Sequence, residues 1–85
     1  MTETQKQAVD FVRYVLEQLC EQKSEIKIEI EEKEHEKVLL LTVAGTDMGR
    51  AIGKEGQTVT ALRTLVKIIG ARGGEKLYLK IKDSE

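Results

Sequence analysis

The 85 residues predict one small α+β domain with the element order helix, strand, strand, helix, helix, strand. Apolar residues recur at helical spacing in two long segments, and apolar and charged residues alternate in others. Paired glycines separate the later elements. We therefore expect a three-stranded mixed sheet with helices on one face, formed by residues 1–85 as a single domain.

Residues 4–20 are expected to form the first helix. The apolar residues of this segment follow the three, four, seven spacing of one helical face: Ala8, Val12, Val15, Leu16 and Leu19, with Val9 and Phe11 beside them. Cys20, at the end of the segment, is interpreted as a packing residue rather than a reactive thiol. Because it is the only cysteine, an internal disulfide is excluded.

Three further segments read as strands. In residues 25–31 the isoleucines Ile26, Ile28 and Ile30 alternate with charged residues, which indicates a half-buried strand. A polar turn over 33–36 leads to the continuous apolar run 38–43, which is typical of a central strand, so the two should form an antiparallel hairpin. Residues 75–82 alternate again, with Leu77, Leu79 and Ile81 inward. Tyr78 faces outward, where it could stack on a base or lie in a dimer contact.

The remaining segments read as two helices. Thr46 and Asp47 are N-cap candidates for a short helix over 48–53. A longer helix is expected over 57–70, with Val59, Leu62, Val66 and Ile69 on one stripe. Gly70, together with Gly73 and Gly74, should end that helix and turn the chain.

Between these two helices lies the most informative motif, Gly53-Lys54-Glu55-Gly56. Glycine has no Cβ, so another backbone can approach closely. The following helix begins with free N–H groups, which carry partial positive charge. Both properties suit a sugar–phosphate chain. The plainer interpretation is a tight corner between helices.

The charge distribution is uneven although the net charge is only −1. Residues 1–49 contain six Lys/Arg and eleven Asp/Glu, a balance of −5, whereas residues 50–85 contain eight and four, a balance of +4. The balance therefore changes at Arg50, beside the glycine motif. A local positive surface is what a phosphate chain requires, although such charges can also serve solubility alone.

Residues 49–59 resemble the Ile-Gly-x-x-Gly signature of KH domains, whose loop clamps about four nucleotides. The element order resembles their bacterial, type II arrangement, and residues 47–67 within so short a chain resemble the small stand-alone bacterial KH-domain RNA-binding proteins. This resemblance implies an RNA chaperone or post-transcriptional regulator that binds single-stranded RNA with little sequence preference. It also implies a homodimer, or a heterodimer with a larger KH-containing RNA-binding protein, and a link to cell elongation, cell shape and cell wall organization.

The predicted RNA-binding residues lie in and around the loop: Arg50, Ile52, Gly53, Lys54, Glu55, Gly56, Gln57, Thr58, Val59 and Arg63. Glu55 departs from the usual pattern, in which the two variable loop residues are basic, polar or small. A carboxylate beside phosphate is repelled by up to about 1 kcal/mol in water, so we expect weak, salt-sensitive binding. The alternative function is a protein-interaction or dimerisation scaffold with weak or no RNA binding.

Other classes of function find little support. Acid–base pairs and nucleophile–histidine sets are absent, so we expect no enzyme, cofactor, metal or small-molecule substrate. His35 lies alone in a charged turn. The spacing of Gly49, Gly53 and Lys54 is one residue short of a P-loop and lacks its Ser/Thr.

Location and association can also be predicted. The chain has no apolar run that could cross a membrane and no signal peptide, so we expect a cytoplasmic protein.

The run 38–43 is apolar on both of its faces. The helices are expected to cover only one face of the three-stranded sheet, so the other face is left open. An association surface is therefore expected, either on the open sheet face or at the glycine corner with its flanking helices.

Overall fold

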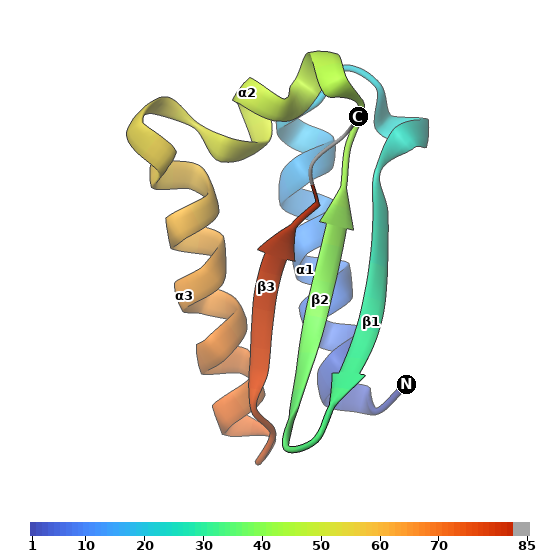
Figure 1. The fold of residues 1–85 in the computed structure, drawn as a ribbon, viewed down its shortest axis with the longest axis vertical. Coiled ribbons are helices and arrows are strands. Elements are labelled where there is room, and N and C mark those ends of the chain that lie inside the picture. The colour runs from blue at the N-terminus through green and yellow to red at the C-terminus, as the bar shows by residue number, and fades with distance from the viewer. Residues whose placement is uncertain (83–85) are drawn as a thin grey trace.

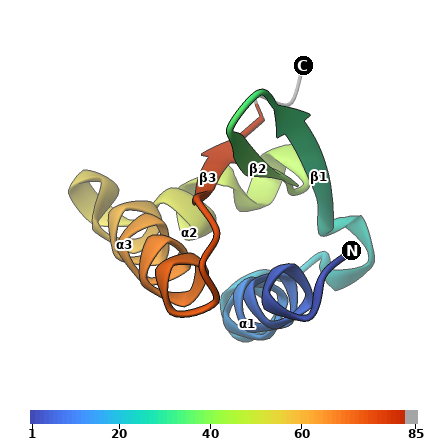
Figure 2. The same ribbon diagram turned by 90° about the horizontal axis from the view of Figure 1, so that it is seen from below.

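The computed structural model describes residues 1–82 and shows a three-stranded sheet with two long helices packed against one face (Figure 1). The elements in chain order are α1 (Glu3–Leu19), β1 (Lys27–Lys33), β2 (Glu36–Thr42), α2 (Met48–Ile52), α3 (Gln57–Arg72) and β3 (Leu77–Ile81). Figure 2 shows α1 and α3 on the same side of the sheet. The predicted α+β class, the element order and the type II arrangement are confirmed.

The sheet has β2 in its centre, as the apolar run predicted. β1 pairs with β2 antiparallel, and β2 pairs with β3 parallel. Leu39 and Leu41 are fully buried against the helices. On the opposite face, Val38, Leu40 and Thr42 form a narrow strip, in which Val38 is buried. Its neighbours are Glu31, Glu29 and Lys27 on β1 and Tyr78 and Lys80 on β3. The open face is therefore less apolar than β2 alone suggested.

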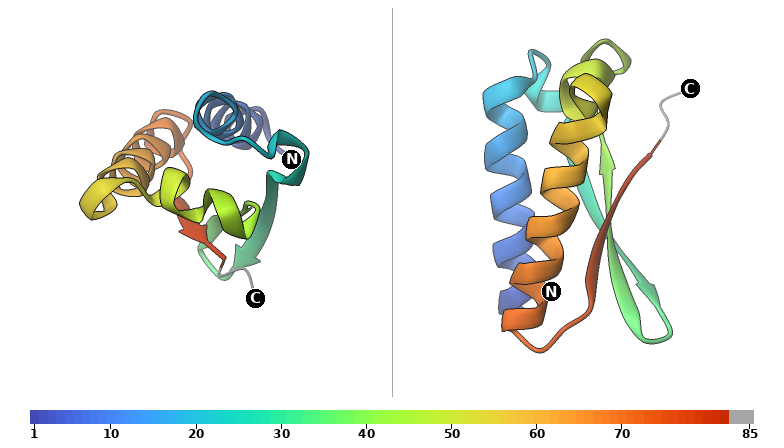
Figure 3. Two further views of the ribbon diagram at one scale, coloured as in Figure 1. Left: turned by 90° about the horizontal axis from the view of Figure 1, so that it is seen from above. Right: turned by 90° about the vertical axis from the view of Figure 1, so that its left-hand side faces the viewer.

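The core lies between the sheet and the helix pair. It is built from residues of every main element, among them Val12 and Leu16 of α1, Leu39 of β2, and Val66 of α3. Figure 3 shows the two helices side by side, with the sheet to one side of them and α2 at one end. This arrangement places the segment between α2 and α3 at the end of the molecule, where its backbone is accessible.

The first helix is anchored at its start. Thr2 caps it and forms a capping box with Gln5, so the helix begins at Glu3 and ends at Leu19, one residue earlier at each end than predicted. The hydroxyl of Thr2 and the side-chain amide of Gln5 donate hydrogen bonds of 2.6 and 3.0 Å to the carboxylate of Glu75. These bonds tie the beginning of α1 to the turn before β3.

The hairpin is shifted relative to the prediction. Residues 23–25 form a 3₁₀ turn, so β1 begins at Lys27 rather than residue 25, although Ile26 is buried as expected. The strands extend to Lys33 and Glu36 because these two residues pair across the ladder. The turn is thereby reduced to Glu34 and exposed His35.

The prediction that Gly70 ends the third helix is wrong. The helix continues to Arg72, and Gly73 follows it as the C-cap. A Cβ at position 70 would lie 2.8 Å from the carbonyl oxygen of Glu75 and 2.9 Å from the Cβ of Leu77. Gly70 therefore serves close packing between α3 and the chain entering β3. Gly74, with φ of 76°, makes the turn.

Within the described part of the chain, the helices are all too short or too polar to span a lipid bilayer.

Candidate nucleic-acid interface

The glycine motif forms a tight connection between two helices. α2 ends at Ile52, and the N–H of Gly53 donates to the carbonyl of Gly49 at 2.8 Å. One 3₁₀ turn follows, closed by the N–H of Gly56 on the carbonyl of Gly53 at 3.0 Å. α3 then begins without a side-chain cap, because the N-cap residue is Gly56 itself. Its first N–H groups therefore have no side-chain acceptor at this cap.

Both glycines of the motif occupy backbone conformations that favour glycine. Gly53 has φ of 82° and Gly56 has φ of 75°. A Cβ at Gly53 would also lie against the hydroxyl of Thr58 and 2.8 Å from its backbone nitrogen. The open space around Gly56, with nothing within 4 Å of an added Cβ, leaves its backbone accessible. The two glycines thus differ in role, one for close packing and one for conformation.

Glu55 lies between them in the left-handed region, with φ of 56° and ψ of 25°. It is the only non-glycine residue with positive φ among residues 1–82. Left-handed backbone is unfavourable for residues with a Cβ. The side chains of Lys54 and Glu55 are both exposed. The loop therefore presents one positive and one negative group at its tip.

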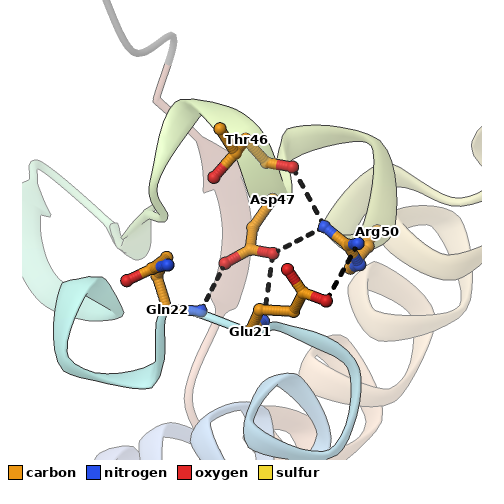
Figure 4. Close-up of polar contacts among 5 residues, drawn as sticks. All are labelled: Glu21, Gln22, Thr46, Asp47 and Arg50. Carbon is orange, nitrogen blue, oxygen red and sulfur yellow. Dashed lines mark hydrogen bonds and ion pairs between the residues drawn. The ribbon is translucent and has the colours of Figure 1, made fainter.

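A buried carboxylate holds α2 in place. Asp47 is fully buried, and its oxygens accept hydrogen bonds from the backbone N–H groups of Glu21 at 3.0 Å and Gln22 at 2.8 Å (Figure 4). These two N–H bonds, and then the neighbouring Arg50 guanidinium, hold the pKa of this carboxyl below its ordinary value. Asp47 is the N-cap residue of α2, as predicted, but its side chain forms no capping hydrogen bond there. It instead connects α2 to the end of α1.

Arg50 belongs to the same cluster. Its guanidinium donates to Asp47 and to the carbonyl of Thr46, at 3.0 and 3.1 Å, and lies 3.5 Å from the carboxylate of Glu21 (Figure 4). Of the predicted RNA-binding residues, it is the one directed toward the end of α1 rather than along α3. Sequence reasoning missed this cluster because Glu21 and Gln22 contribute backbone groups, which no side-chain pattern reveals.

The other predicted residues lie at the end of α2 and along α3. Ile52 is half-buried and Val59 is buried, so both contribute apolar surface beside the glycines and pack with the core. Gln57 is exposed and Thr58 half-buried in the first turn of α3. Arg63, one turn after Val59, donates from Nε to the carbonyl of Leu79 at 3.3 Å. It therefore spans from α3 to the edge strand β3.

A second surface lies on the helix layer. A groove of about 430 Å³ runs between α1 and α3, lined by Phe11, Val15, Gln57, Thr58, Ala61, Leu62 and Leu65. Exposed apolar side chains occur on the same two helices, with Tyr14 65% exposed, Leu65 42% and Ile68 50%. We call this the helix-layer surface. It is more apolar than the open sheet face, and it begins directly after the glycine loop.

Cys20 is buried in the core at the end of α1. Burial raises the pKa of its thiol, which disfavours the reactive thiolate. The interpretation of Cys20 as a packing residue is therefore confirmed.

The fold and the glycine loop together define a KH domain of type II. The family model described as KhpA/KhpB, KH domain, matches residues 9–81. The chain belongs to this family.

Relatives match across most of their length. The RNA-binding protein KhpA of Chlamydia caviae is 36% identical over 76 residues, covering 89% of this chain and 97% of the relative. The proteins of the same name from Listeria monocytogenes and Borreliella burgdorferi are 32% and 28% identical, over 85% and 88% of this chain and 95% and 92% of theirs. This chain is thus similar to whole proteins whose names describe them as RNA-binding.

Proposed function

We propose that this protein binds single-stranded RNA without catalysing a reaction, and that the loop Gly53–Gly56 grips the RNA backbone. The observation that carries this proposal is the loop geometry. Two glycines with positive φ leave an exposed backbone turn, and α3 begins there without a side-chain cap. N–H groups at a helix start bind phosphate. The names of the relatives point to the same class of ligand.

The binding should be weak and only slightly dependent on sequence. Contacts from the loop reach the backbone of RNA rather than base edges, and backbone contacts carry no sequence information. Glu55 opposes phosphate, whereas Lys54 and Arg63 favour it. Such binding suits an RNA chaperone or post-transcriptional regulator, which must engage many RNAs and release them.

The test is a charge change that retains both glycines. In the double variant K54D/E55D, two carboxylates face the phosphates, so RNA affinity should fall while the melting temperature changes little. Filter retention or gel shift with single-stranded RNA measures the first, and circular dichroism the second. Equal retention of RNA by the variant and the natural sequence would contradict the loop grip and favour the scaffold alternative.

Salt dependence provides a second readout of the same proposal. Log affinity should fall linearly with log salt, by about 0.7 for each phosphate neutralised on a single strand. With three or four basic residues near the loop and α3, the slope should be about −2 to −3. An affinity that does not change with salt would mean that phosphate contacts do not drive binding.

We also propose that the protein associates through the helix-layer surface, with a second copy as the partner. The exposed side chains of Tyr14, Leu65 and Ile68 lie on its two helices, whereas the open sheet face has the narrow strip of Val38, Leu40 and Thr42 with Tyr78 beside it. A stripe repeated on a second copy can meet itself across a two-fold axis. The larger KH-containing RNA-binding protein that the family resemblance implies as a partner would compete with the second copy for this surface.

A further inference from the structure

The side of α3 that faces β3 carries a row of residues leading away from the glycine loop. Arg63 and Lys67 lie one turn apart on α3, and both reach across to β3. Arg63 donates to the Leu79 carbonyl, and the ammonium of Lys67 lies 5.8 Å from the centre of the Tyr78 ring. This distance is within the range of a cation–π contact. The row therefore connects the loop to the aromatic side chain of Tyr78, near the start of β3.

A small hollow lies at that end of the row. It has a volume of about 170 Å³ and is lined by Lys67, Ala71, Glu75, Lys76, Leu77 and Tyr78. Pockets for drug-sized molecules measure about 300–1,000 Å³. The hollow suits one planar group rather than a larger ligand.

The charges around the hollow favour binding of a negatively charged nucleic-acid backbone. Lys67 and Lys76 line it, and Lys80 follows Tyr78 on the same face of β3. The one carboxylate in the lining, Glu75, accepts hydrogen bonds from Thr2 and Gln5, which hold it toward the start of α1. Among residues 1–82, Lys67, Lys76 and Lys80 form no salt bridge, so their ammonium groups can meet phosphates. Tyr78 is half-buried, so part of its ring is accessible beside the Lys67 ammonium.

We propose that Tyr78 and Lys67 form a stacking site for one RNA base beyond those held at the glycine loop. Lys67 lies about 15 Å along α3 from Gln57, at the helical rise of 1.5 Å per residue. The loop of a KH domain grips about four nucleotides. An RNA strand that runs from the loop along the row of residues between α3 and β3 would place a later base on the Tyr78 ring. The phosphates of that nucleotide would then lie near Lys67 and Lys76. This site rests on the proposed function of the loop.

The first experiment compares RNA length. Natural protein and the variants Y78A, Y78L and Y78F are titrated with oligouridines of four and eight nucleotides, by amide chemical-shift changes for the weak complexes. Removing a stacked aromatic residue weakens binding by about fivefold or more. Y78A and Y78L should lose at least that factor for the eight-mer and little for the four-mer, while Y78F should bind like the natural protein. Y78L keeps an apolar side chain on β3, which separates loss of stacking from loss of fold.

Tyr14 gives a matched control. It is the only other tyrosine, and it lies on α1. Y14F, which keeps an aromatic ring on the helix-layer surface, should leave the affinity for the eight-mer unchanged. In the Y14F background, Tyr78 is the only tyrosine, and a stacked base should quench its fluorescence with the eight-mer but not with the four-mer.

The outcomes separate the two proposals. If Y78A and Y78L bind the eight-mer as the natural protein does, and the Tyr78 fluorescence does not change, the stacking site is wrong although K54D/E55D still loses binding. If the natural protein binds neither oligonucleotide, the loop proposal fails and the stacking site fails with it.

Discussion

Glu55 is the residue where backbone conformation and charge both oppose the proposed role of the loop. Its left-handed conformation is unfavourable for a side chain with a Cβ, and its carboxylate is exposed beside the positions where phosphate would lie. The charge was recognised from the sequence, but the conformation was not, because it depends on how Gly53 and Gly56 close the turn.

Replacing Glu55 with Asn tests both disadvantages together. Asn tolerates left-handed backbone and carries no charge. E55N should raise the free energy of unfolding by up to about 1 kcal/mol and tighten RNA binding by a few-fold. Urea denaturation and RNA titration measure the two effects.

The neighbouring variant K54N is the matched control. Lys54 does not have positive φ, so Asn should not stabilise the fold there, and loss of its positive charge should weaken RNA binding. Equal effects of E55N and K54N on stability would contradict the role assigned to the left-handed residue.

Asp47 predicts how stability depends on pH. Its pKa is lower in the folded protein than the ordinary value of 3.8, mainly because the Glu21 and Gln22 N–H groups bind the carboxylate. A carboxyl with a lowered folded pKa contributes stability above its unfolded pKa and loses it as pH falls through the folded pKa. The natural protein should therefore lose stability as pH falls below about 4.

The variant D47N isolates this contribution. It should be less stable at pH 7, because an amide offers one acceptor oxygen where three donors converge. Its stability should also change less between pH 5 and pH 2. Urea denaturation at several pH values provides the measurement, and parallel pH curves for the two proteins would show that Asp47 does not carry the effect.

At the scale of elements, the fit of α3 against the turn before β3 depends on Gly70. A methyl group there would overlap the Glu75 carbonyl and Leu77. G70A should therefore lower the free energy of unfolding by about 1–3 kcal/mol. G49A is the control, because Gly49 lies in α2 with nothing within 4 Å of an added Cβ. It should raise stability by up to about 1 kcal/mol through helix propensity.

The same glycine shows where sequence reasoning succeeds and where it stops. Apolar patterns predicted the two long helices and the three strands, because burial of one face is a local property of the residues that make it. The short α2 was predicted instead from the N-cap candidates and the glycine corner that flank it. Gly70 was misread as a helix end, since a glycine needed for close packing and one needed for a turn look alike in sequence. The true turn uses Gly74, whose positive φ becomes visible only in the structure.

The candidate site divides in the same way. The loop and its position between α2 and α3 were predicted from the spacing of Gly53 and Gly56. The Asp47 cluster was not, because its donors are backbone groups brought near by the end of α1. The reach of Arg63 and Lys67 to β3 likewise depends on how α3 lies beside the sheet.

At the scale of the whole molecule, the helix-layer surface predicts the mode of association. L65E places a charge in the groove between α1 and α3 and should convert a dimer to a monomer without unfolding it, since Leu65 is 42% exposed. T64E, at an exposed neighbouring position of α3, is the control and should remain dimeric. Light scattering over a range of concentrations measures the mass.

Addition of RNA sharpens this test. Gln57 and Thr58 line the groove and are also predicted to bind RNA, so dimerisation and RNA binding should compete, and excess RNA should shift the protein toward monomer. A natural protein that stays monomeric at high concentration would contradict association through this surface.

The two edges of the sheet carry charges of opposite sign. β1 carries Glu29, Glu31 and Glu32 against Lys27 and Lys33, a balance of −1, whereas Lys76, Lys80 and Lys82 against Glu75 give +2 on and beside β3, at the other edge (Figure 1). With a net charge of −1, the molecule is barely pulled or repelled by a distant polyanion, but we expect these opposite balances to give it a dipole moment across the sheet. Near a nucleic acid this dipole experiences a torque that turns β3 and α3 toward the strand before contact. Orientation during the encounter, rather than net attraction, would then set how often a collision is productive.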